Sequence, residues 1–159
     1  MTDLIGKKVG ESLTEMRYLI ETQHLNNINT LFGGQLMSWM DVVAGVAGRS
    51  HADTPVTMVA VDNMQITAPA RLGDTLILRA KVTNVGRTSM EILVEVEAES
   101  EDKAPRHVAR AFFIAVVVDA EGRSTLSPPL IVETDEERKL WDDAEKRKEL
   151  RKQRQAMQI

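Results

Sequence analysis

The chain has 159 residues, a formal net charge of -4 at pH 7 and no cysteine. This length suits one domain with a sizeable core, or one domain with an appendage. The missing cysteines exclude disulfides and cysteine-based metal or redox sites, and the mildly acidic balance argues against nucleic acid as a partner. No signal peptide is recognisable, and no apolar run approaches the roughly 20 residues of a membrane span. We therefore expect a cytoplasmic protein that binds no membrane.

The first third of the chain predicts a strand, a polar loop and a long helix. Residues 14–20 lead directly into a polar loop over residues 23–32, so we interpret them as a strand. The apolar residues that follow recur at helical spacing, which predicts a helix over about 34–51. Because its first turns carry no charge, we expect this helix to be buried on nearly all sides. Asp41 then needs a reason for its position, since an unpaired buried carboxylate is costly.

Four strands are predicted after this helix, because the hydrophobic period changes to two beyond Pro55. We place them over residues 56–67, 75–85, 90–99 and 108–118. The third alternates apolar residues with mostly acidic ones, which is typical of a strand with one solvent-facing side. A charged segment that contains a proline separates it from the fourth and indicates a loop. The fourth is apolar on both faces, so we expect it in the middle of a covered sheet.

A charged helix is predicted at the C-terminal end, beyond the proline-rich segment 127–129. Thr134 and Glu137 form a capping-box pattern for a helix that ends near residue 155. Acidic residues occupy its first turns and basic residues its end, which suits the helix dipole. It is either a solvated tail or a helix whose basic end neutralises a ligand phosphate. We divide the chain into a domain over residues 1–130 and a charged helical extension over residues 131–159.

These elements indicate an α+β fold. In it a curled antiparallel sheet wraps around a central long helix, and a C-terminal helix is added to it. Such an arrangement accounts for a helix that is apolar on most of its surface.

Residues 29–41, NTLFGGQLMSWMD, resemble the signature of hotdog-fold acyl-CoA thioesterases. The group that fits is the acyl-CoA hydrolase family, which includes the brain-type enzymes and single-domain bacterial relatives. Further matches follow in family order within residues 13–129, among them Val61-Asp62, Gly73-Asp74 and Gly86-Arg87-Thr88-Ser89-Met90-Glu91. The resemblance implies a hotdog fold and hydrolysis of acyl-CoA, with no metal and no cofactor beyond the coenzyme A of the substrate. It also implies paired sheets, so we expect at least a homodimer and, beyond it, a trimer of dimers.

The resemblance places the family's catalytic carboxylate on Asp41 and its catalytic asparagine on Asn26. In such enzymes each site takes the asparagine loop from one chain and the helix acid from another. Spacing before the double glycine alone favours Asn26 over Asn27 and Asn29. Thr30 occupies a position at which some relatives carry aspartate or asparagine, and we place it with Gly34 and Gln35 among the candidate residues for the oxyanion and the substrate.

Thioester hydrolysis needs an activated nucleophile, groups that stabilise the oxyanion and groups that bind coenzyme A. Asp41 can act as general base on a water or attack the carbonyl itself, and the sequence leaves both routes open. Backbone N–H groups around Gly34 and Gln35 are the natural oxyanion donors, since they lack intrahelical acceptors at the positive end of the helix dipole. The structural alternatives are an ion pair or a cap for Asp41 and a turn for Asn26.

Arg87, Thr88 and Ser89 combine a cation with two hydroxyls beside a glycine, so they are candidates to bind the phosphates of coenzyme A. A plain hairpin turn is the alternative. The three histidines lack metal-ligand spacing, and no Gly-x-Ser-x-Gly motif is present to suggest a serine triad. No histidine lies between Asn26 and Arg49, which disfavours a hotdog hydratase. A non-catalytic acyl-CoA-binding hotdog module stays open as the alternative to an enzyme.

Overall fold

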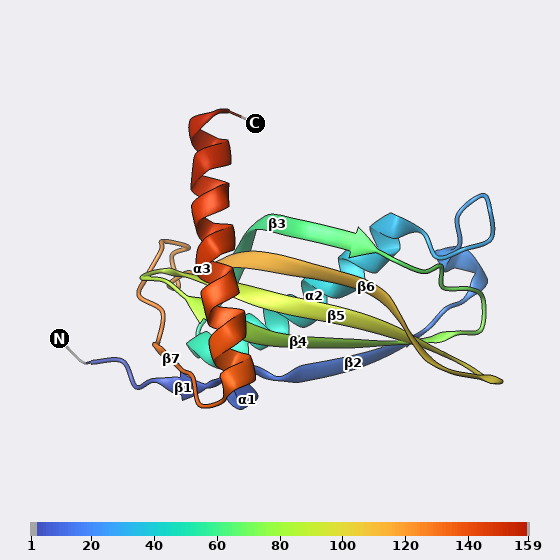
Figure 1. Ribbon diagram of the computed structural model, residues 1–159, viewed down its shortest axis with the longest axis horizontal. Coiled ribbons are helices and arrows are strands. Elements are labelled where there is room, and N and C mark those ends of the chain that lie inside the picture. Colours follow the sequence, from blue (N-terminus) through green and yellow to red (C-terminus); the bar gives the residue numbers. More distant parts are fainter. Residues whose placement is uncertain (1–2, 159) are drawn as a thin grey trace.

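The computed structural model describes residues 3–158, and in them a five-stranded antiparallel sheet curls around one long helix (Figure 1). In the order of their pairing, the strands are β2 Thr14–Leu19, β4 Thr75–Val85, β5 Ser89–Ser100, β6 Lys103–Val117 and β3 Val56–Ile66. The central helix is α2, Gly33–Ala52, and α3, Asp135–Ala156, crosses the outer face of the sheet. The predicted fold is confirmed.

The β5–β6 hairpin is longer than the sequence indicated. We expected a charged loop between these strands, and this is wrong, because β6 begins at Lys103 after a two-residue turn. Arg106 is held inside the extended hairpin, where it donates to Asp74, to Ser100 and to the carbonyl of Pro69. Burial by itself would raise the pKa of Asp74, but hydrogen bonds from Ser100 and Arg106 hold this pKa below its ordinary value.

Short elements tie the N-terminal arm to the segment that precedes α3. β1 (Lys7–Lys8) pairs in parallel with β7 (Leu130–Ile131), and the single-turn helix α1 (Val9–Ser12) leads into β2. Such short elements carry no measurable hydrophobic period, so the sequence did not predict them. The Nε2 of His51, at the end of α2, lies 2.8 Å from the carbonyl oxygen of Pro128. Burial lowers the pKa of His51, which fits this structural role.

One side of α2 forms the centre of the core. The buried residues on this side are Leu36, Trp39, Met40, Val43, Ala44 and Ala47. At Gly48 a Cβ would lie 3.0 Å from Val56 and 3.1 Å from Ile92, so the glycine permits close contact between helix and sheet. In the described part of the chain, no helix combines the length and hydropathy needed to cross a membrane.

The other side of α2 is open, which corrects the expectation of a helix buried on nearly all sides. Met37, Val42 and Val46 are 42%, 46% and 40% exposed, and Asp41 is exposed on the same face. The physical reason is that the sheet curls around one side of the helix only. This exposed face, which we call the α2 stripe, joins three apolar side chains and one acid.

α3 begins where the capping box predicted. The Thr134 hydroxyl accepts a hydrogen bond from the Glu137 N–H at 3.1 Å, and the Glu137 carboxylate accepts from the Thr134 N–H at 3.3 Å. The helix buries Ala144 against the outer face of the sheet. Its C-terminal end extends past the edge strand β3 (Figure 1).

The basic end of α3 pairs with carboxylates of the sheet. Arg147 donates to both oxygens of Glu91, at 2.9 and 2.7 Å, and its guanidinium carbon lies 3.7 Å from the centre of the Phe112 ring. Glu91, which the alternating pattern placed towards solvent, is only 3% exposed because α3 covers it. Its partner therefore comes from a helix that lies far away in the sequence.

A second buried carboxylate, Asp62 of β3, is 6% exposed and accepts hydrogen bonds from Arg151 at 3.1 Å and Arg154 at 3.0 Å. Burial by itself would raise the pKa of Asp62, but the hydrogen bonds from these two arginines hold it below its ordinary value. Neutralising the protein's own carboxylates is thus one role of the basic end of α3.

Replacing Arg147 by alanine should lower the free energy of unfolding by about 3 kcal/mol, because Glu91 would stay buried without its main partner. Urea unfolding of the purified protein measures this change. Arg138→Ala removes an exposed arginine of the same helix and should change stability by less than about 0.5 kcal/mol. Equal, small effects of both substitutions would show that the buried ion pair contributes nothing to the docking of α3.

Candidate active site

The loop before α2 is organised by the side chain of Asn26. Its Oδ1 accepts hydrogen bonds from the N–H groups of Ile28 at 3.0 Å and Thr30 at 3.1 Å, and its Nδ2 donates to the Thr30 hydroxyl at 2.9 Å. A carboxamide has two N–H donors, so one remains for a ligand. Asn27 and Asn29 are exposed, and Asn29 takes the left-handed φ of 60° that the turn requires. The loop thus holds the Asn26 amide in a fixed position.

Aromatic contacts anchor this loop to α2. The ring of His24 meets Trp39 edge-on with centroids 4.8 Å apart, and Trp39 stacks on Tyr18 at 4.6 Å. The Nδ1 of His24 also accepts a hydrogen bond from the Glu21 N–H at 3.0 Å. These contacts give His24 a structural role and set the position of the asparagine loop relative to the helix.

The start of α2 presents free backbone donors. The first helical hydrogen bond in this turn runs from the Leu36 N–H to the Phe32 carbonyl at 3.1 Å. Within the described residues, the N–H groups of Gly34 and Gln35 therefore have no backbone acceptor. A Cβ at Gly34 would lie 2.5 Å from the Phe32 ring, so a side chain here would displace that ring. The predicted oxyanion donors and the Asn26 loop lie at the same end of α2.

Asp41 lies eight residues beyond Gly33, which corresponds to about 12 Å along the helix axis. Its carboxylate is exposed on the α2 stripe and neither caps a helix nor forms an ion pair within residues 3–158. No hydrogen bond of the described chain joins it to Asn26. Asp41 thus lies about two turns into α2, whereas the Asn26 loop precedes the start of that helix.

The predicted coenzyme A residues lie near the opposite end of α2. Arg87 and Thr88 lie in the β4–β5 turn and Ser89 is the first residue of β5; we refer to the three together as the β4–β5 turn. The Gly86 N–H closes it by donating to the Ser89 carbonyl at 2.8 Å. This turn leads into the part of β5 that packs on Gly48. Gly48 lies about 21 Å along the helix from Gly34. The chain thus divides the predicted site between the two ends of α2.

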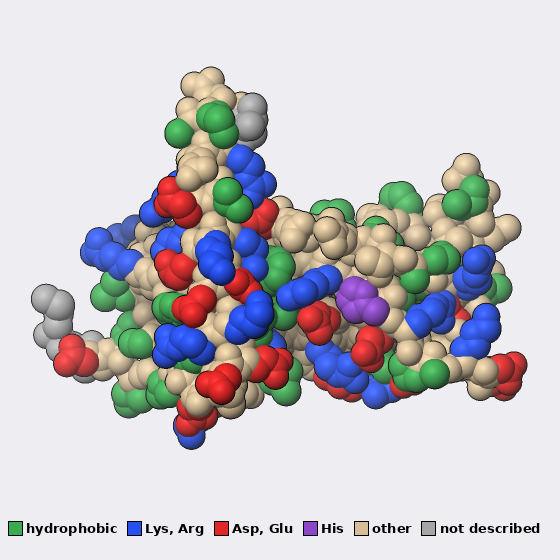
Figure 2. Space-filling model, in the orientation of Figure 1, with side chains coloured by type: hydrophobic (Ala, Val, Ile, Leu, Met, Phe, Trp, Pro, Cys, Tyr) green, Lys and Arg blue, Asp and Glu red, His purple; other side chains and the backbone are tan. Residues whose placement is uncertain are grey.

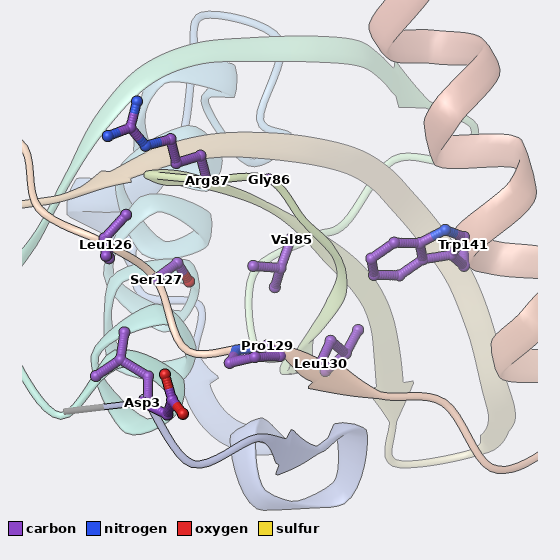
Figure 3. A pocket seen from close by; sticks show the side chains of 10 residues that line it. Asp3, Val85, Gly86, Arg87, Leu126, Ser127, Pro129, Leu130 and Trp141 are labelled. Carbon is purple, nitrogen blue, oxygen red and sulfur yellow. The ribbon is translucent and has the colours of Figure 1, made fainter. Parts of the chain in front are cut away.

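Two cavities flank these groups. One of about 270 Å³ lies beside the start of α2, where Thr30, Leu36, Ala70 and Val108 line it together with the segment after β3. The other, of about 600 Å³, is lined by the β4–β5 turn, the segment before β7 and Trp141 of α3 (Figure 3).

A third cavity of about 240 Å³ lies between the β4–β5 turn and α3, and Ser89, Lys148 and Lys152 help to line it. Neither lysine was singled out from the sequence. The basic end of the predicted helix is the only sign of this cavity in the sequence.

The sheet that curls around α2, with paired glycines at the start of the helix and an acid on its open face, defines a hotdog-fold protein. A family model described as the thioesterase superfamily matches residues 28–104. A Bacillus subtilis relative, described as an uncharacterized acyl-CoA thioester hydrolase, is 35% identical over 130 residues, which cover 81% of this chain and 76% of the relative. The chain belongs to the thioesterase superfamily.

Solved structures extend this similarity to nearly the whole chain. An apo-hexameric acyl-CoA thioesterase is 31% identical, with a TM-score of 0.92, and the match covers 96% of this chain and 99% of the other. An acyl-CoA hydrolase of Staphylococcus aureus, solved in complex with butyryl coenzyme A and coenzyme A, is 29% identical with a TM-score of 0.88 over 96% and 93% of the chains.

Alanine variants of the Staphylococcus aureus hydrolase have also been solved, one at an asparagine and one at an aspartate. In that chain the two altered residues have the same separation as Asn26 and Asp41 have in this one.

Proposed function

We propose that this chain hydrolyses acyl-CoA thioesters to a free carboxylic acid and coenzyme A, at a site that two copies of the chain share. It is an acyl-CoA thioesterase, in agreement with the relatives and structures to which it is similar. The shared site is inferred from the different places of the proposed catalytic residues along one chain. No hydrogen bond joins Asn26 to Asp41 within the described chain. The Asn26 loop precedes α2, whereas Asp41 lies about 12 Å along that helix and is exposed among apolar residues.

A second copy of the chain would cover the two surfaces that are left open. β3 pairs only with β6 in the described sheet, so its other edge has free backbone donors and acceptors. The α2 stripe is exposed and largely apolar, as expected for a face that another protomer covers. The assembly is therefore at least a homodimer, and the apo-hexameric neighbour supports a trimer of dimers. A cytoplasmic location stays a prediction.

The exposed carboxylate of Asp41 supports two routes to the same products. As a general base it takes a proton from a water that attacks the thioester carbon, and the C–S bond breaks as the proton passes to the thiolate. As a nucleophile it forms an acyl-aspartyl anhydride and expels the thiolate, after which water releases the acid and restores Asp41. Neither route requires a metal or another cofactor.

The start of α2 supplies the groups that stabilise the oxyanion. The free N–H groups of Gly34 and Gln35 lie at the positive end of the helix dipole. There they donate hydrogen bonds to the oxygen on which negative charge develops. The unused N–H of the Asn26 amide adds a donor that is already held in place, because Thr30 binds the other one. The adjacent cavity beside Thr30 and Leu36 is the proposed entrance for the acyl chain.

The β4–β5 turn of Arg87, Thr88 and Ser89 is the proposed binding element for coenzyme A phosphates. Arg87 is exposed and forms no ion pair within residues 3–158, so its guanidinium is free for an anion. Within one chain this turn is distant from Gly34. The turn that binds coenzyme A at a given active site therefore belongs to the protomer that places it next to the bound substrate.

Thiol release from a series of acyl-CoAs tests the activity, and Asn26→Asp tests the amide. The new carboxylate keeps the acceptor oxygen for the Ile28 and Thr30 N–H groups but cannot donate to substrate. We expect kcat to fall about a hundredfold, the loss typical of one oxyanion donor. Asn27→Asp introduces the same charge next to it and should keep turnover close to wild type.

A wild-type chain that binds coenzyme A but releases no thiol at any acyl length would favour the alternative, a non-catalytic acyl-CoA-binding module. An Asn26→Asp enzyme as active as Asn27→Asp would show that the Asn26 amide donates nothing to the reaction.

A further inference from the structure

The β4–β5 turn has a second polar side, which faces α3. The third cavity separates the turn from the helix and is lined by Ser89, Lys148 and Lys152, among other residues. A Cβ at Gly86 would lie 3.4 Å from the Nζ of Lys148 and 3.1 Å from the Oγ of Ser89. The missing side chain at Gly86 therefore lets an ammonium and a hydroxyl approach the same point of the turn.

Two of the cations that line this cavity have no ion-pair partner in the described residues. Glu91 also lines the cavity, but Arg147 already binds both of its carboxylate oxygens. The arginines of α3 share the two buried carboxylates of the sheet, whereas Lys148 and Lys152 form no ion pair anywhere in residues 3–158. Glu145, one turn before Lys148, accepts a hydrogen bond from the amide of Asn84 at 2.8 Å. Figure 2 shows Lys and Arg side chains interspersed with Asp and Glu side chains along this helix. An anion is the ligand that would compensate the two free ammonium groups.

The two sides of the turn offer two separate cations. The Arg87 side chain points away from Trp141 of α3, as Figure 3 shows, whereas Lys148 reaches the turn from α3 itself. Coenzyme A carries phosphate at two places, a diphosphate in its chain and a phosphate on its ribose. One cation on each side of a hydroxyl-bearing turn fits such a ligand better than it fits a single free phosphate.

On the basis of the proposed function, we propose that Lys148, together with Lys152 and Ser89, binds a phosphate of the coenzyme A moiety, so that α3 forms one wall of the substrate site. Lysine binds phosphate as a point charge, and its half-buried position limits screening by solvent. The ion pair of Arg147 with Glu91 fixes the position of α3 on the sheet, and with it the position of Lys148. Lys148 is thereby a substrate-binding residue outside the signature segment.

The test compares Lys148→Ala with wild type on three substrates that share one acyl group. These are acyl-CoA, acyl-dephospho-CoA without the ribose phosphate, and acyl-pantetheine without any phosphate. We expect kcat/KM to fall about tenfold for acyl-CoA and to stay unchanged for acyl-pantetheine. Lys148→Arg should restore most of the loss. Lys139→Ala, on the same helix but paired with Asp143, should behave as wild type on all three.

The dephospho substrate identifies the phosphate involved. A loss confined to acyl-CoA assigns Lys148 to the ribose phosphate, whereas a loss on both nucleotide substrates assigns it to the diphosphate. An equal loss on acyl-pantetheine, or none on acyl-CoA, overturns the proposal.

Titration calorimetry with coenzyme A alone separates this proposal from the proposed function. The dissociation constant should rise about tenfold in Lys148→Ala, even if the wild-type chain turned over no acyl-CoA. Unchanged affinity for coenzyme A would contradict the lysine contact, whatever the activity.

Discussion

Asp41→Asn is expected to lower kcat/KM for acyl-CoA by between about a hundredfold and ten-thousandfold, the range typical of a lost general base. Asparagine has nearly the same shape but neither accepts a proton nor attacks a carbonyl at neutral pH. Because Asp41 is exposed and forms no ion pair within residues 3–158, the substitution removes no contact of the single chain. Thermal unfolding should therefore be unchanged while thiol release almost disappears.

Asp142→Asn is the matched control, since it removes the same charge from an exposed position on α3. It should keep wild-type turnover. An Asp41→Asn enzyme with the activity of this control would mean that the acid on the α2 stripe serves assembly and not chemistry.

Val46→Glu is expected to separate the oligomer into monomers and to abolish most of the hydrolysis. Val46 is 40% exposed at the C-terminal end of the α2 stripe, one turn beyond Val42. A carboxylate at this position would be buried without a partner when a second chain covers the face, which costs several kcal/mol. The monomer itself should stay folded, because the new side chain is then in solvent. Light scattering during size-exclusion chromatography measures the assembly, and thiol release measures the activity.

Leu13→Glu introduces the same side chain at another exposed apolar position, next to β2 at the far edge of the sheet. It should leave the dimer and its activity in place. A Val46→Glu protein that is monomeric and fully active would contradict a site shared between chains. One that stays oligomeric would show that the α2 stripe faces no partner.

Mixing two inactive variants is the most direct test of whether two chains share one active site. In a mixed dimer of Asp41→Asn and Asn26→Asp, one site combines both defects and the other receives an intact Asn26 loop and an intact Asp41. Unfolding and refolding the two variants together should restore activity that neither shows alone. Without any recovery in verified mixed dimers, both groups would have to come from the same chain.

The main elements of the fold could be predicted because their signals are local. The change from a helical period to a period of two at Pro55 separates α2 from β3, and β4 begins and ends as expected at Thr75 and Val85. The capping box of Thr134 and Glu137 marked the start of α3 correctly. Hydrophobic periods and caps depend on neighbours within a few residues, so the sequence displays them directly. The division of the chain at residue 130 stays a prediction.

The surroundings of the charged residues could not be predicted in this way. Glu91 looked solvent-facing because its strand alternates, yet Arg147 reaches it from 56 residues away. Asp41 looked buried because its helix is apolar, yet the sheet covers only the other side of that helix. Both misreadings have one cause: a local pattern shows that a face is apolar or polar, but not which element covers it.

The sequence by itself therefore determined the order of the five strands of the main sheet and the two long helices. Through the resemblance it also supplied the residues proposed for the chemistry. Only the tertiary structure decided that Asp41 is exposed on the open face of α2, and that the β4–β5 turn lies towards the other end of that helix. It also brought Lys148 of α3 next to Gly86 of that turn. Periodicity is fixed by bonded neighbours, whereas distances between charges depend on how the sheet curls and where the final helix crosses it.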